Sequence, residues 1–549
     1  MIIDRDPPLL RAVFWIYLTV VPVFAVWRTA VVAWDVWYGP PAWAAEMFAV
    51  LTTTMFVLSL RRRSHPEPRA VTTVTATVDI LVPTVNEPLT VLEPTVFGAL
   101  RVRGVRDVIV LDDGVRPEVH AMAERLGARY LPRATSEGAK AGNLNHGLTV
   151  SDAEFVVTLD ADHIPLPEFI EQTLAYFDDP SVAVVQSPQS FYNTESFTFR
   201  DGGWHEQQMF YGGVQPTKNT TNSAIFTGTS AMLRRAALDQ IGGFAVDTST
   251  EDIHTSLRLH ARGWRSIYLQ RPLAYGLEVE NLREYYGTRR RWAIGSLHLL
   301  LRHPDSPLRV RGLSLWQRLN YLSAMVAHFQ GVNRLIYLLV PVLALTTGVA
   351  AVTGPYAVYG FAFLAFTVFS LWTVVRFGRG HYHMLHSESF AVADTLPMIA
   401  ALVPALVGER QFGVTAKRTS RRTDLRLKLA YRGFAALNLA ALAYAVVRLV
   451  RGEHLVIAGW SAAFLTMSAV YVLVFLYGME RYERSPVTPW YVDLTPEQLY
   501  RRIVAGPVTT RTPRRPGSGA VAGRPSAALI AGYATGVAAP ESGDPVTAA

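Results

Sequence analysis

Long apolar segments limit what this chain can fold into more than any other feature of its sequence. An α-helix needs about 20 mostly apolar residues to cross the hydrocarbon core of a bilayer. Segments of this length and character lie at residues 9–34, 42–60, 331–353, 356–376, 431–450 and 455–478. The sequence therefore predicts about six membrane-spanning helices, two before and four after a long intervening region.

The composition agrees with a membrane location and excludes several kinds of site. Half of the residues are hydrophobic and only 17% are charged, whereas about 25% of a typical soluble protein is charged. The formal net charge is +8, but basic clusters such as 61–63 and 417–422 lie beside apolar segments, as cytoplasmic membrane flanks do. We therefore expect no nucleic-acid partner. The absence of cysteine excludes disulfides, thiolate metal sites and cysteine nucleophiles.

The basic residues also predict which side of the membrane each segment faces. With two spans before the intervening region and four after it, both termini and that region lie on the same side. The outer loops near 35–41 and 354–355 contain no Lys or Arg, and the third, near 448–454, contains Arg448 and Arg451. The balance favours a multi-pass protein of the cell membrane with the termini and the intervening region in the cytoplasm. The first apolar segment lacks a small-residue cleavage site, so we expect a retained anchor.

The intervening region has the pattern of an α/β domain. Buried-strand runs at 78–83, 108–111 and 155–159 are separated by helical patterns, which favours a mostly parallel sheet. Two further segments, 282–302 and 393–408, are predicted to lie at the membrane interface. The expected division of the chain is 1–64 (two spans), 65–310 (α/β domain), 311–480 (four spans with interfacial helices) and 481–549 (a cytoplasmic, mostly disordered tail).

Acidic residues follow the predicted strands directly. Glu87 lies after the first strand, Asp112 at the end of the second, and Asp160 and Asp162 after the third. Ligands of such sheets bind at the carboxyl ends of the strands. Two carboxylates two residues apart can converge on one Mg²⁺ or Mn²⁺ that also binds substrate phosphates, and an aspartate at a strand end can bind a nucleotide. Each pattern alone also fits an ordinary polar turn.

Three more segments carry groups suited to a charged ligand. Lys140 lies among small residues before a helical pattern, where it can contact phosphate or remain a solvated lysine. Thr250, Glu251 and Asp252 begin another helical pattern, where they can cap the helix or deprotonate a hydroxyl group. The run 289–292 (RRRW) joins cations to an aromatic face. It suits a diphosphate and a sugar ring, or anchoring at the membrane surface.

The order and spacing of these motifs resemble those of one family. The matching stretches are PTVNEP (83–88), LDDG (111–114), AKAGNLN (139–145), LDADH (159–163), FTGTSAMLRR (226–235), TEDIHTSLRLHARGW (250–264) and RRRW (289–292). They resemble the processive membrane glycosyltransferases of family 2, and especially the catalytic subunit of bacterial cellulose synthase. FGVTAK (412–417) is similar to the FxVTxK gating loop of cellulose synthases. The resemblance covers about residues 10–480.

The resemblance implies an α/β GT-A glycosyltransferase domain inserted in an α-helical transmembrane region of about six spans plus interfacial helices. It implies an inverting enzyme that polymerises glucose from UDP-glucose into a cellulose-like β-1,4-glucan. The spans would form a channel that secretes the growing polysaccharide across the lipid bilayer, and accessory secretion subunits would be partners. Family members with a C-terminal PilZ domain bind cyclic di-GMP. We find no DxSxxG motif after the last span and expect no cyclic di-GMP site on this chain.

The resemblance also implies a role for each motif residue. Asp252 would be the general base, and Asp160 and Asp162 would hold the metal and the diphosphate. The nucleotide would be contacted by Glu87, Asp112, Lys140, Asp160, Thr415 and Lys417. The leaving diphosphate would contact Arg290 and Arg291. The acceptor would contact Thr227, Glu251, Thr288 and Trp292.

Two departures from the family pattern leave the product open. Thr288 stands where the QxxRW motif of the family has Gln, and Thr227 replaces a cysteine common in the family. The same machinery could therefore make a mixed-linkage or β-1,3-glucan, a mannan or an N-acetylated glycan. A transporter or scaffold with an inactive transferase domain is the other alternative. The spans show few ionisable residues, with His328, Asn333 and Arg334 near the start of one, which argues against a transporter.

Overall fold

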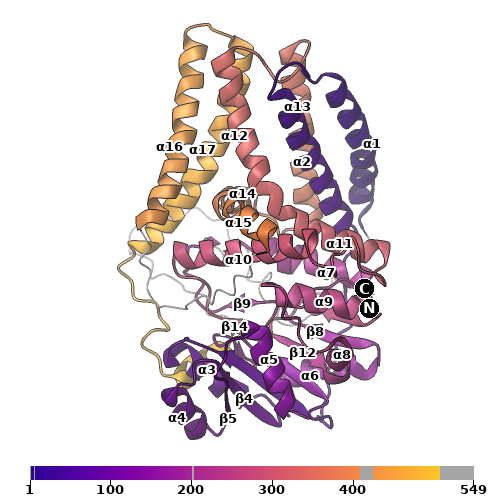
Figure 1. Ribbon diagram of the computed structural model, residues 1–549, viewed down its shortest axis with the longest axis vertical. Coiled ribbons are helices and arrows are strands. Elements are labelled where there is room, and N and C mark those ends of the chain that lie inside the picture. Colours follow the sequence, from indigo (N-terminus) through magenta and orange to yellow (C-terminus); the bar gives the residue numbers. More distant parts are fainter. Residues whose placement is uncertain (1, 5, 201–202, 409–424, 507–549) are drawn as a thin grey trace, which may run out of the picture.

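The protein has an apolar helical bundle at one end and an α/β domain at the other (Figure 1). The computed structural model describes residues 2–4, 6–200, 203–408 and 425–506. Helices that lie across the long axis separate the two parts (Figure 1). The chain passes from bundle to domain after the second helix and returns after α10 (Leu282–Leu301).

Among the residues that the structure describes, six helical spans are long and apolar enough to cross a membrane, or seven if the bent pair 384–407 is one span. They are α1 (Pro8–Ala30), α2 (Gly39–Ser59), the unit Leu315–Thr347 formed by α11 (Leu315–Val326), η4 (Ala327–Phe329) and α12 (Gln330–Thr347), α13 (Tyr356–Phe377), α16 (Leu425–Val450) and α17 (Leu455–Glu483). The predicted number and order of spans are confirmed. The third span begins earlier than the predicted residue 331, because a capping box formed by Ser314 and Gln317 starts the helix there.

A seven-stranded mixed sheet forms the core of the α/β domain. Its strand order is β13-β8-β12-β6-β3-β4-β5. The strands are β3 (Val78–Thr84), β4 (Asp107–Asp112), β5 (Arg129–Pro132), β6 (Phe155–Thr158), β8 (Val182–Gln186), β12 (Ala231–Arg234) and β13 (Arg265–Tyr268). The predicted mostly parallel sheet is confirmed. Only β12, among the described strands of this sheet, pairs antiparallel with its neighbours.

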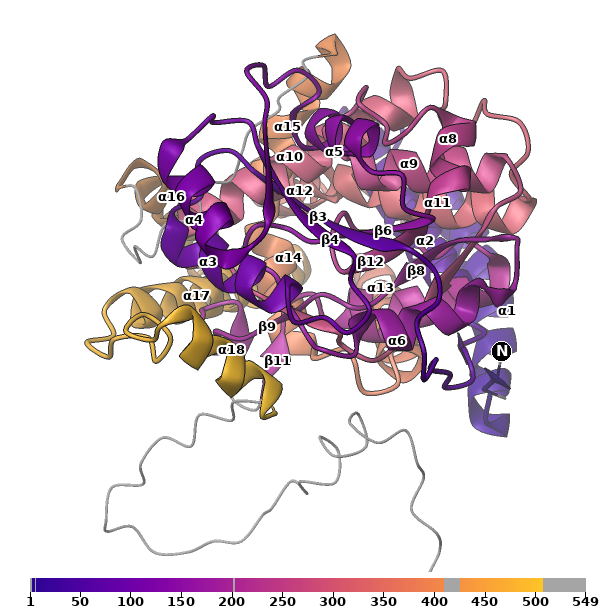
Figure 2. The ribbon, with the colours of Figure 1, turned by 90° about the horizontal axis from the view of Figure 1, so that it is seen from below.

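Helices cover both faces of this sheet (Figure 2). On one face, α3 (Leu89–Ala99) and α4 (Pro117–Leu126) contribute apolar side chains to a large buried cluster. On the other face, α5 (Ala139–Val150), α8 (Arg235–Ile241) and α9 (Glu251–Ala261) do the same. Every residue of β3 is buried, which is typical of a strand covered on both faces. The sheet is therefore rigid, and its polar carboxyl-end loops are held in fixed positions.

The two segments predicted to be interfacial are helices between the bundle and the domain (Figure 1). α10 packs along α15 (Thr395–Val407), which follows α14 (Met384–Ala393) after a bend of 41°. Tyr285 of α10 donates a hydrogen bond of 2.6 Å to Asp394 at this bend. α10 thereby joins the α/β domain to the membrane side of the protein.

Part of the segment assigned to a disordered tail is ordered. After α17 the chain returns to the domain and forms α18 (Pro496–Val504), which begins with a capping box. Leu499, Tyr500 and Ile503 of α18 pack in one buried cluster with residues of α3 and of a small sheet. This sheet consists of β7 (Ile164–Pro165), β14 (Ala274–Gly276) and β9 (Ser190–Phe191), in the order β7-β14-β9. The expectation of a mostly disordered tail is therefore wrong for residues 484–506. The composition of 507–549 dominated that expectation, and those residues lie outside the described part of the chain.

The membrane bundle contains a buried ion pair that the sequence analysis overlooked. Arg28 of α1 is 0% exposed and donates hydrogen bonds of 2.6 and 3.0 Å to Glu46 of α2. Tyr359 of α13 donates a third hydrogen bond, of 2.8 Å, to the same carboxylate. The helices α1, α2 and α13 are therefore connected by one buried ion pair and its hydrogen bond to a tyrosine.

We expect Glu46→Leu to destabilise the protein by about 3–5 kcal/mol, because it leaves the guanidinium of Arg28 buried without its counter-ion. The measurement is thermal unfolding of the purified protein in detergent. The matched control is the double variant Arg28→Leu/Glu46→Leu, which should recover most of the loss. Equal melting temperatures for the single and double variants would contradict a paired role.

Candidate active site

A cavity of about 780 Å³ lies between the carboxyl ends of the strands and the helices at the membrane side. Its floor includes the loops after β3 and β6 and the N-terminus of α5. Its roof includes one face of α10, the α11–η4 segment and the end of α2. Sequence motifs separated by up to 200 residues thus meet in one cavity, as expected for an α/β sheet.

Asp160, Asp162 and His163 form an acidic cluster on the floor. One ligand atom from each lies within 4.8 Å of the others. Asp162 and His163 are buried, and a contact of 3.0 Å joins the carboxylate of Asp162 to Nδ1 of His163. Mg²⁺ and Mn²⁺ prefer oxygen ligands, so the two carboxylates fit the predicted divalent metal, with His163 beside them.

Lys140 lies beside this cluster at the start of α5. Its Nζ forms an ion pair with Asp160 and donates a hydrogen bond of 2.9 Å to the carbonyl oxygen of Gly228. Burial opposes the charged form, but the carboxylates of Asp160 and Glu251 outweigh it and raise the pKa of Lys140. The group is therefore a fixed cation at a helix N-terminus, an arrangement that favours phosphate oxygens.

Asp252 lies in the first turn of α9, on the same cavity. Burial, followed by the nearby carboxylate of Glu251, raises the pKa of Asp252 to about 7, although Ile253 N–H, Lys140 and Arg291 oppose the shift. Thr250 occupies the N-cap position, but its side chain makes no capping hydrogen bond. The alternative of helix capping therefore does not hold for the Thr250 hydroxyl, and the Asp252 carboxylate accepts a hydrogen bond of 2.8 Å from the backbone of Ile253.

Gly228 separates Lys140 from Asp252 and has no room for a side chain. A Cβ atom added there would lie 3.0 Å from Nζ of Lys140 and 3.5 Å from Oδ2 of Asp252. The φ angle of Gly228 is +82°, which also favours glycine. This glycine allows the cationic and the basic groups to approach one small volume of the cavity from two sides.

One face of α10 supplies the roof. Thr288, Arg289, Arg291, Trp292 and Ser296 line the cavity. Arg290 does not, because it lies on another face of the helix and donates a hydrogen bond of 3.4 Å to the carbonyl oxygen of Ala400 on α15. Helical spacing on its own would have separated Arg290 from this face, but the sequence analysis grouped Arg290 with Arg291.

Arg289 is the residue of the RRRW run that the sequence analysis gave no role. Its guanidinium forms ion pairs with Glu206 and, at 3.8 Å, with Asp394 at the α14–α15 bend. The same guanidinium lies 4.6 Å from the centre of the Trp292 ring. Arg289 thereby fixes the orientation of the ring that faces the cavity and connects it to the interfacial helices.

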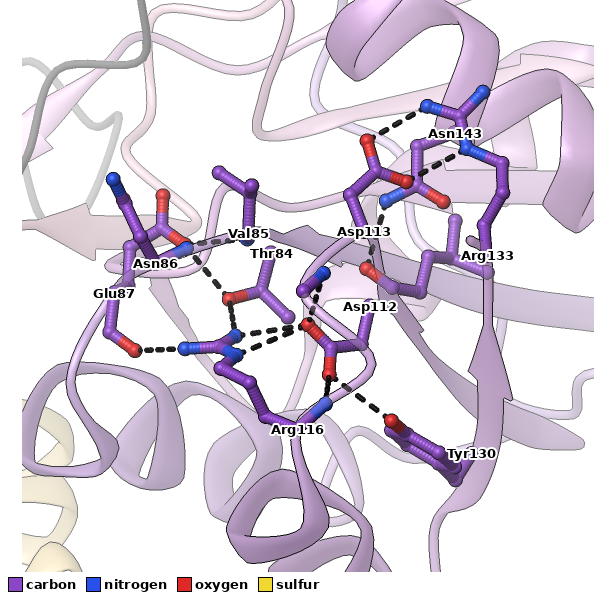
Figure 3. A network of polar contacts seen from close by, with 12 residues as sticks. Thr84, Val85, Asn86, Glu87, Asp112, Asp113, Arg116, Tyr130, Arg133 and Asn143 are labelled. Carbon is purple, nitrogen blue, oxygen red and sulfur yellow. Dashed lines mark hydrogen bonds and ion pairs between the residues drawn. The ribbon is translucent and has the colours of Figure 1, made fainter. Parts of the chain in front are cut away.

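The loops after β3 and β4 form a polar network that places the LDDG motif differently from the prediction (Figure 3). Asp112 is fully buried and accepts hydrogen bonds from the backbone and side chain of Arg116, the backbone of Gly114 and the hydroxyl of Tyr130. It does not line the cavity. Its acceptor capacity is used within the protein, so a direct contact between Asp112 and a nucleotide does not fit this geometry.

The neighbouring residues of this network do reach the cavity. Asp113 lines it and pairs with Arg133 through two hydrogen bonds of 2.7 Å. Glu87 also lines it and accepts from the hydroxyl of Thr84 and the backbone of Val85. The network thus fixes the shape of this end of the cavity and presents Glu87 and Asp113 to it (Figure 3).

The remaining predicted site residues divide into two groups. Thr227 and Glu251 line the cavity together with the residues above. Thr415 and Lys417 lie outside the described residues. His163, Tyr211 and Lys218 also line the cavity, and the sequence analysis missed all three. His163 was visible as the residue after the DxD triplet, whereas no sequence signal indicated Tyr211 or Lys218.

A mixed sheet with acidic strand ends, a helix-borne RRRW face and an apolar helical bundle are therefore combined in this chain. Residues 155–377 match the family model described as glycosyl transferase family group 2. The UDP-forming cellulose synthase catalytic subunit of Pseudomonas fluorescens (strain SBW25) is 32% identical over 467 residues, which cover 81% of this chain and 61% of that protein. Cellulose synthase 1 of Komagataeibacter xylinus is 35% identical over 416 residues, which cover 72% of this chain and 26% of that protein.

The chain is thus similar to glycosyl transferase family group 2 over residues 155–377, and over most of its length to cellulose synthase catalytic subunits. It spans between about a quarter and three fifths of the length of the relatives named above. Among solved structures, the mannosyltransferase PcManGT from Pyrobaculum calidifontis in complex with GDP-Man and Mn²⁺ aligns with 73% of this chain and 99% of that chain, at 18% identity and a TM-score of 0.46.

We expect Asp112→Ala to lower the free energy of unfolding by about 3 kcal/mol, because it leaves Arg116 and two backbone N–H groups without their acceptor. Thermal unfolding without nucleotide measures the effect. Asp239→Ala, which removes an exposed partner of Arg235, is the matched control and should change stability little. If Asp112→Ala keeps the wild-type melting temperature but loses UDP affinity, Asp112 is a nucleotide contact as the sequence predicted.

Proposed function

We propose that this protein is a membrane-embedded, inverting, processive glycosyltransferase that polymerises glucose from UDP-glucose into a β-glucan and translocates the product. The observation that supports this proposal is that a candidate base and a candidate site for a charged diphosphate lie side by side in one cavity. Asp252 is a carboxylate with a pKa of about 7, and Lys140, Asp160 and Asp162 form a site for a metal-bound diphosphate next to it. An inverting transfer needs a base on one side of the sugar and charge neutralisation on the other.

In the proposed reaction the acceptor hydroxyl of the growing chain faces Asp252. The carboxylate takes the hydroxyl proton while the oxygen forms a bond to the anomeric carbon of the donor glucose. The bond from that carbon to the diphosphate oxygen breaks, and UDP leaves with the electron pair. The ammonium of Lys140 and the guanidinium of Arg291 hold the diphosphate. A divalent cation, when bound at Asp160 and Asp162, would neutralise charge on the same diphosphate.

Other residues of the cavity are proposed to bind the acceptor and the nucleotide. Trp292 offers its ring to the terminal sugar of the acceptor, and Arg289 holds that ring in place. Glu251, Thr227 and Thr288 line the acceptor part of the cavity. Asp113 takes the nucleotide role first given to Asp112, and Glu87 keeps the nucleotide role that the sequence predicted for it. Thr415 and Lys417 are proposed to close over the bound nucleotide, on the resemblance of their motif alone.

The arrangement in the cell is part of the same proposal. The catalytic domain and both termini lie in the cytoplasm, where nucleotide sugars are available, and the six spans cross the cell membrane. The basic clusters beside the apolar segments support this orientation. The growing polysaccharide, the UDP-sugar and the bilayer are the partners, and accessory secretion subunits remain part of the expectation.

A second candidate keeps this machinery and changes the sugar or the linkage. Thr288 lines the cavity, and a threonine hydroxyl cannot make the bidentate contacts of the glutamine amide found in the family. The acceptor can therefore be held at a different angle. A panel of radiolabelled nucleotide sugars, followed by digestion with linkage-specific glycanases, distinguishes a β-1,4-glucan from the other products.

We expect the rate of UDP release to rise with pH through about 7, because the base must be deprotonated and Asp252 has a pKa of about 7. Initial rates with UDP-glucose between about pH 5 and pH 9 measure the profile. Glu251→Gln should move the acidic limb to lower pH, since the Glu251 carboxylate raises the pKa of Asp252. An acidic limb that Glu251→Gln leaves in place would assign it to another group.

We expect Asp252→Asn to abolish polymer synthesis, with a loss of at least about 100-fold, while UDP affinity changes less than about threefold. The amide keeps the shape of the carboxylate but cannot accept the proton. The assay measures glucose incorporation from UDP-glucose and, separately, UDP binding by calorimetry. Asp239→Asn, outside the cavity, is the control. Wild-type-like synthesis by Asp252→Asn removes Asp252 from the base role.

A further inference from the structure

A second large cavity lies beside the catalytic one, and the proposed reaction gives no role to its residues. Its volume is about 1590 Å³. One wall comes from α14 and the end of α17, with Leu385, Phe390 and Phe475. The opposite wall comes from β9 and its neighbouring loops in the α/β domain, and the segment between α17 and α18 closes a third side. The cavity therefore lies where the membrane bundle meets the domain.

This cavity opens on the outer surface of α17. Tyr477 lines the cavity and is 69% exposed, and the neighbouring Gly478 has open space where a Cβ atom would be. α17 begins at Leu455, so Tyr477 lies roughly 33 Å along the helix. This distance is just greater than the thickness of about 30 Å of a hydrocarbon core. The opening is therefore at the level of the lipid headgroups, in the leaflet next to the α/β domain.

The lining of this cavity has an excess of positive charge. Its Lys, Arg, Asp and Glu residues, within the described part of the chain, are Arg63, Arg200, Arg481, Arg484 and Glu195. Arg481 is exposed and makes no hydrogen bond or ion pair with any described residue. Arginines at the membrane surface attract anionic headgroups, so the lining favours an anionic ligand.

Two unpaired hydrogen-bond donors belong to the same lining. Nε1 of Trp490 and Nε2 of Gln270 are buried and have no partner among the described residues, and both side chains line the cavity. Oε1 of Gln270 accepts a hydrogen bond of 2.7 Å from Arg63, which leaves the donor side of the amide for another group. Both atoms can only donate, and buried polar groups are rarely unpaired. A ligand that pairs with them must be an acceptor, as phosphate oxygens are.

The apolar part of the lining distinguishes a lipid from a soluble phosphate compound. On the membrane side it consists of Leu385, Phe390, Val474, Phe475 and Tyr477. A hydrophilic phosphate compound gains nothing from such a wall, whereas a phospholipid covers it with the first segments of its acyl chains. Cations and donors on one side and apolar side chains on the other thus match the two parts of a phospholipid.

We propose that this cavity binds an anionic phospholipid, with its headgroup at Arg481, Trp490 and Gln270 and its acyl chains along α14 and α17. The guanidinium of Arg481 pairs with the headgroup phosphate, and the Trp490 and Gln270 N–H groups donate to its oxygens. The lipid enters from the leaflet next to the α/β domain through the opening at Tyr477.

The lipid site is connected to the catalytic cavity. Gln189, Phe191 and Tyr211 line both cavities. A bound lipid therefore stabilises one wall of the catalytic cavity, and the activity depends on the lipid. The binding itself does not depend on which sugar the protein transfers.

The binding experiment titrates the purified full-length protein in detergent with phosphatidylglycerol and counts bound lipids by native mass spectrometry. We expect one lipid to bind more tightly than the rest. Arg481→Gln keeps a polar side chain and removes its charge, and it should weaken this binding by about 10-fold, the effect of one charge-assisted hydrogen bond. Trp490→Phe keeps an aromatic ring and removes the Nε1 donor, and it should act in the same direction.

The matched control is Arg376→Gln, the same change at an arginine in the last turn of α13, outside the cavity. It should leave the tight binding unchanged, and melting temperatures establish that each variant is folded. Phosphatidylcholine, which has no net charge, should bind more weakly than phosphatidylglycerol. Wild-type affinity in a folded Arg481→Gln variant overturns the site. Displacement of the lipid by an equal concentration of glycerol 3-phosphate also overturns it, because the cavity then binds a soluble phosphate compound.

The activity experiment compares the protein in vesicles of phosphatidylcholine with and without phosphatidylglycerol. We expect UDP release by the wild-type protein to rise severalfold with phosphatidylglycerol, Arg481→Gln to lose this response and Arg376→Gln to keep it. Equal wild-type rates in the two kinds of vesicle overturn the link to the catalytic cavity. If UDP-glucose is the wrong donor, no UDP is released in either kind of vesicle, whereas the binding experiment still decides whether the lipid site exists.

Discussion

The constraint on which this structure depends is that its charged chemistry lies beneath apolar helices. A carboxylate or guanidinium in that position needs a partner from the protein or the ligand, since water is excluded. Lys140 pairs with Asp160, Arg289 with Glu206, and Arg133 with Asp113. These pairs fix the cavity before any ligand enters it. Asp252 forms no ion pair with the described residues, and burial raises its pKa to about 7. That property makes it suitable as a base.

The sequence was a reliable guide wherever a local pattern determines the result. Apolar length gave the six spans, and buried β-branched runs gave β3, β4 and β6. The strands β5, β8, β12 and β13 were not predicted. The antiparallel insertion of β12 depends on long-range pairing, which no local pattern encodes. The start of α11 at Ser314 was missed because α11 is amphipathic and less apolar than the span it continues.

At the site, too, the sequence predicted which kinds of residue are present but not the direction in which each side chain points. The motifs predicted which segments meet, but not which side chain of each segment faces the ligand. Asp112 and Asp113 are adjacent, and the strand places the first in the protein interior and the second on the cavity. Arg289, Arg290 and Arg291 are consecutive, and the helix turns the middle one toward α15. Lys218 could not be recognised from sequence, because no local pattern indicates that it lines the cavity.

The return of the chain to the domain after α17 has a mechanical consequence. The α/β domain is attached to the membrane bundle at three places. They are the segment after α2, the junction of α10 with α11, and the segment that leads from the end of α17 to α18. Attachments at three separate places restrict rigid-body movement of the α/β domain relative to the membrane bundle. In the proposed function, UDP-glucose therefore enters the cavity and UDP leaves it through movements of loops, while the α/β domain stays fixed relative to the bundle. In the proposed function, a fixed domain also keeps the cavity aligned with the bundle from one transfer to the next.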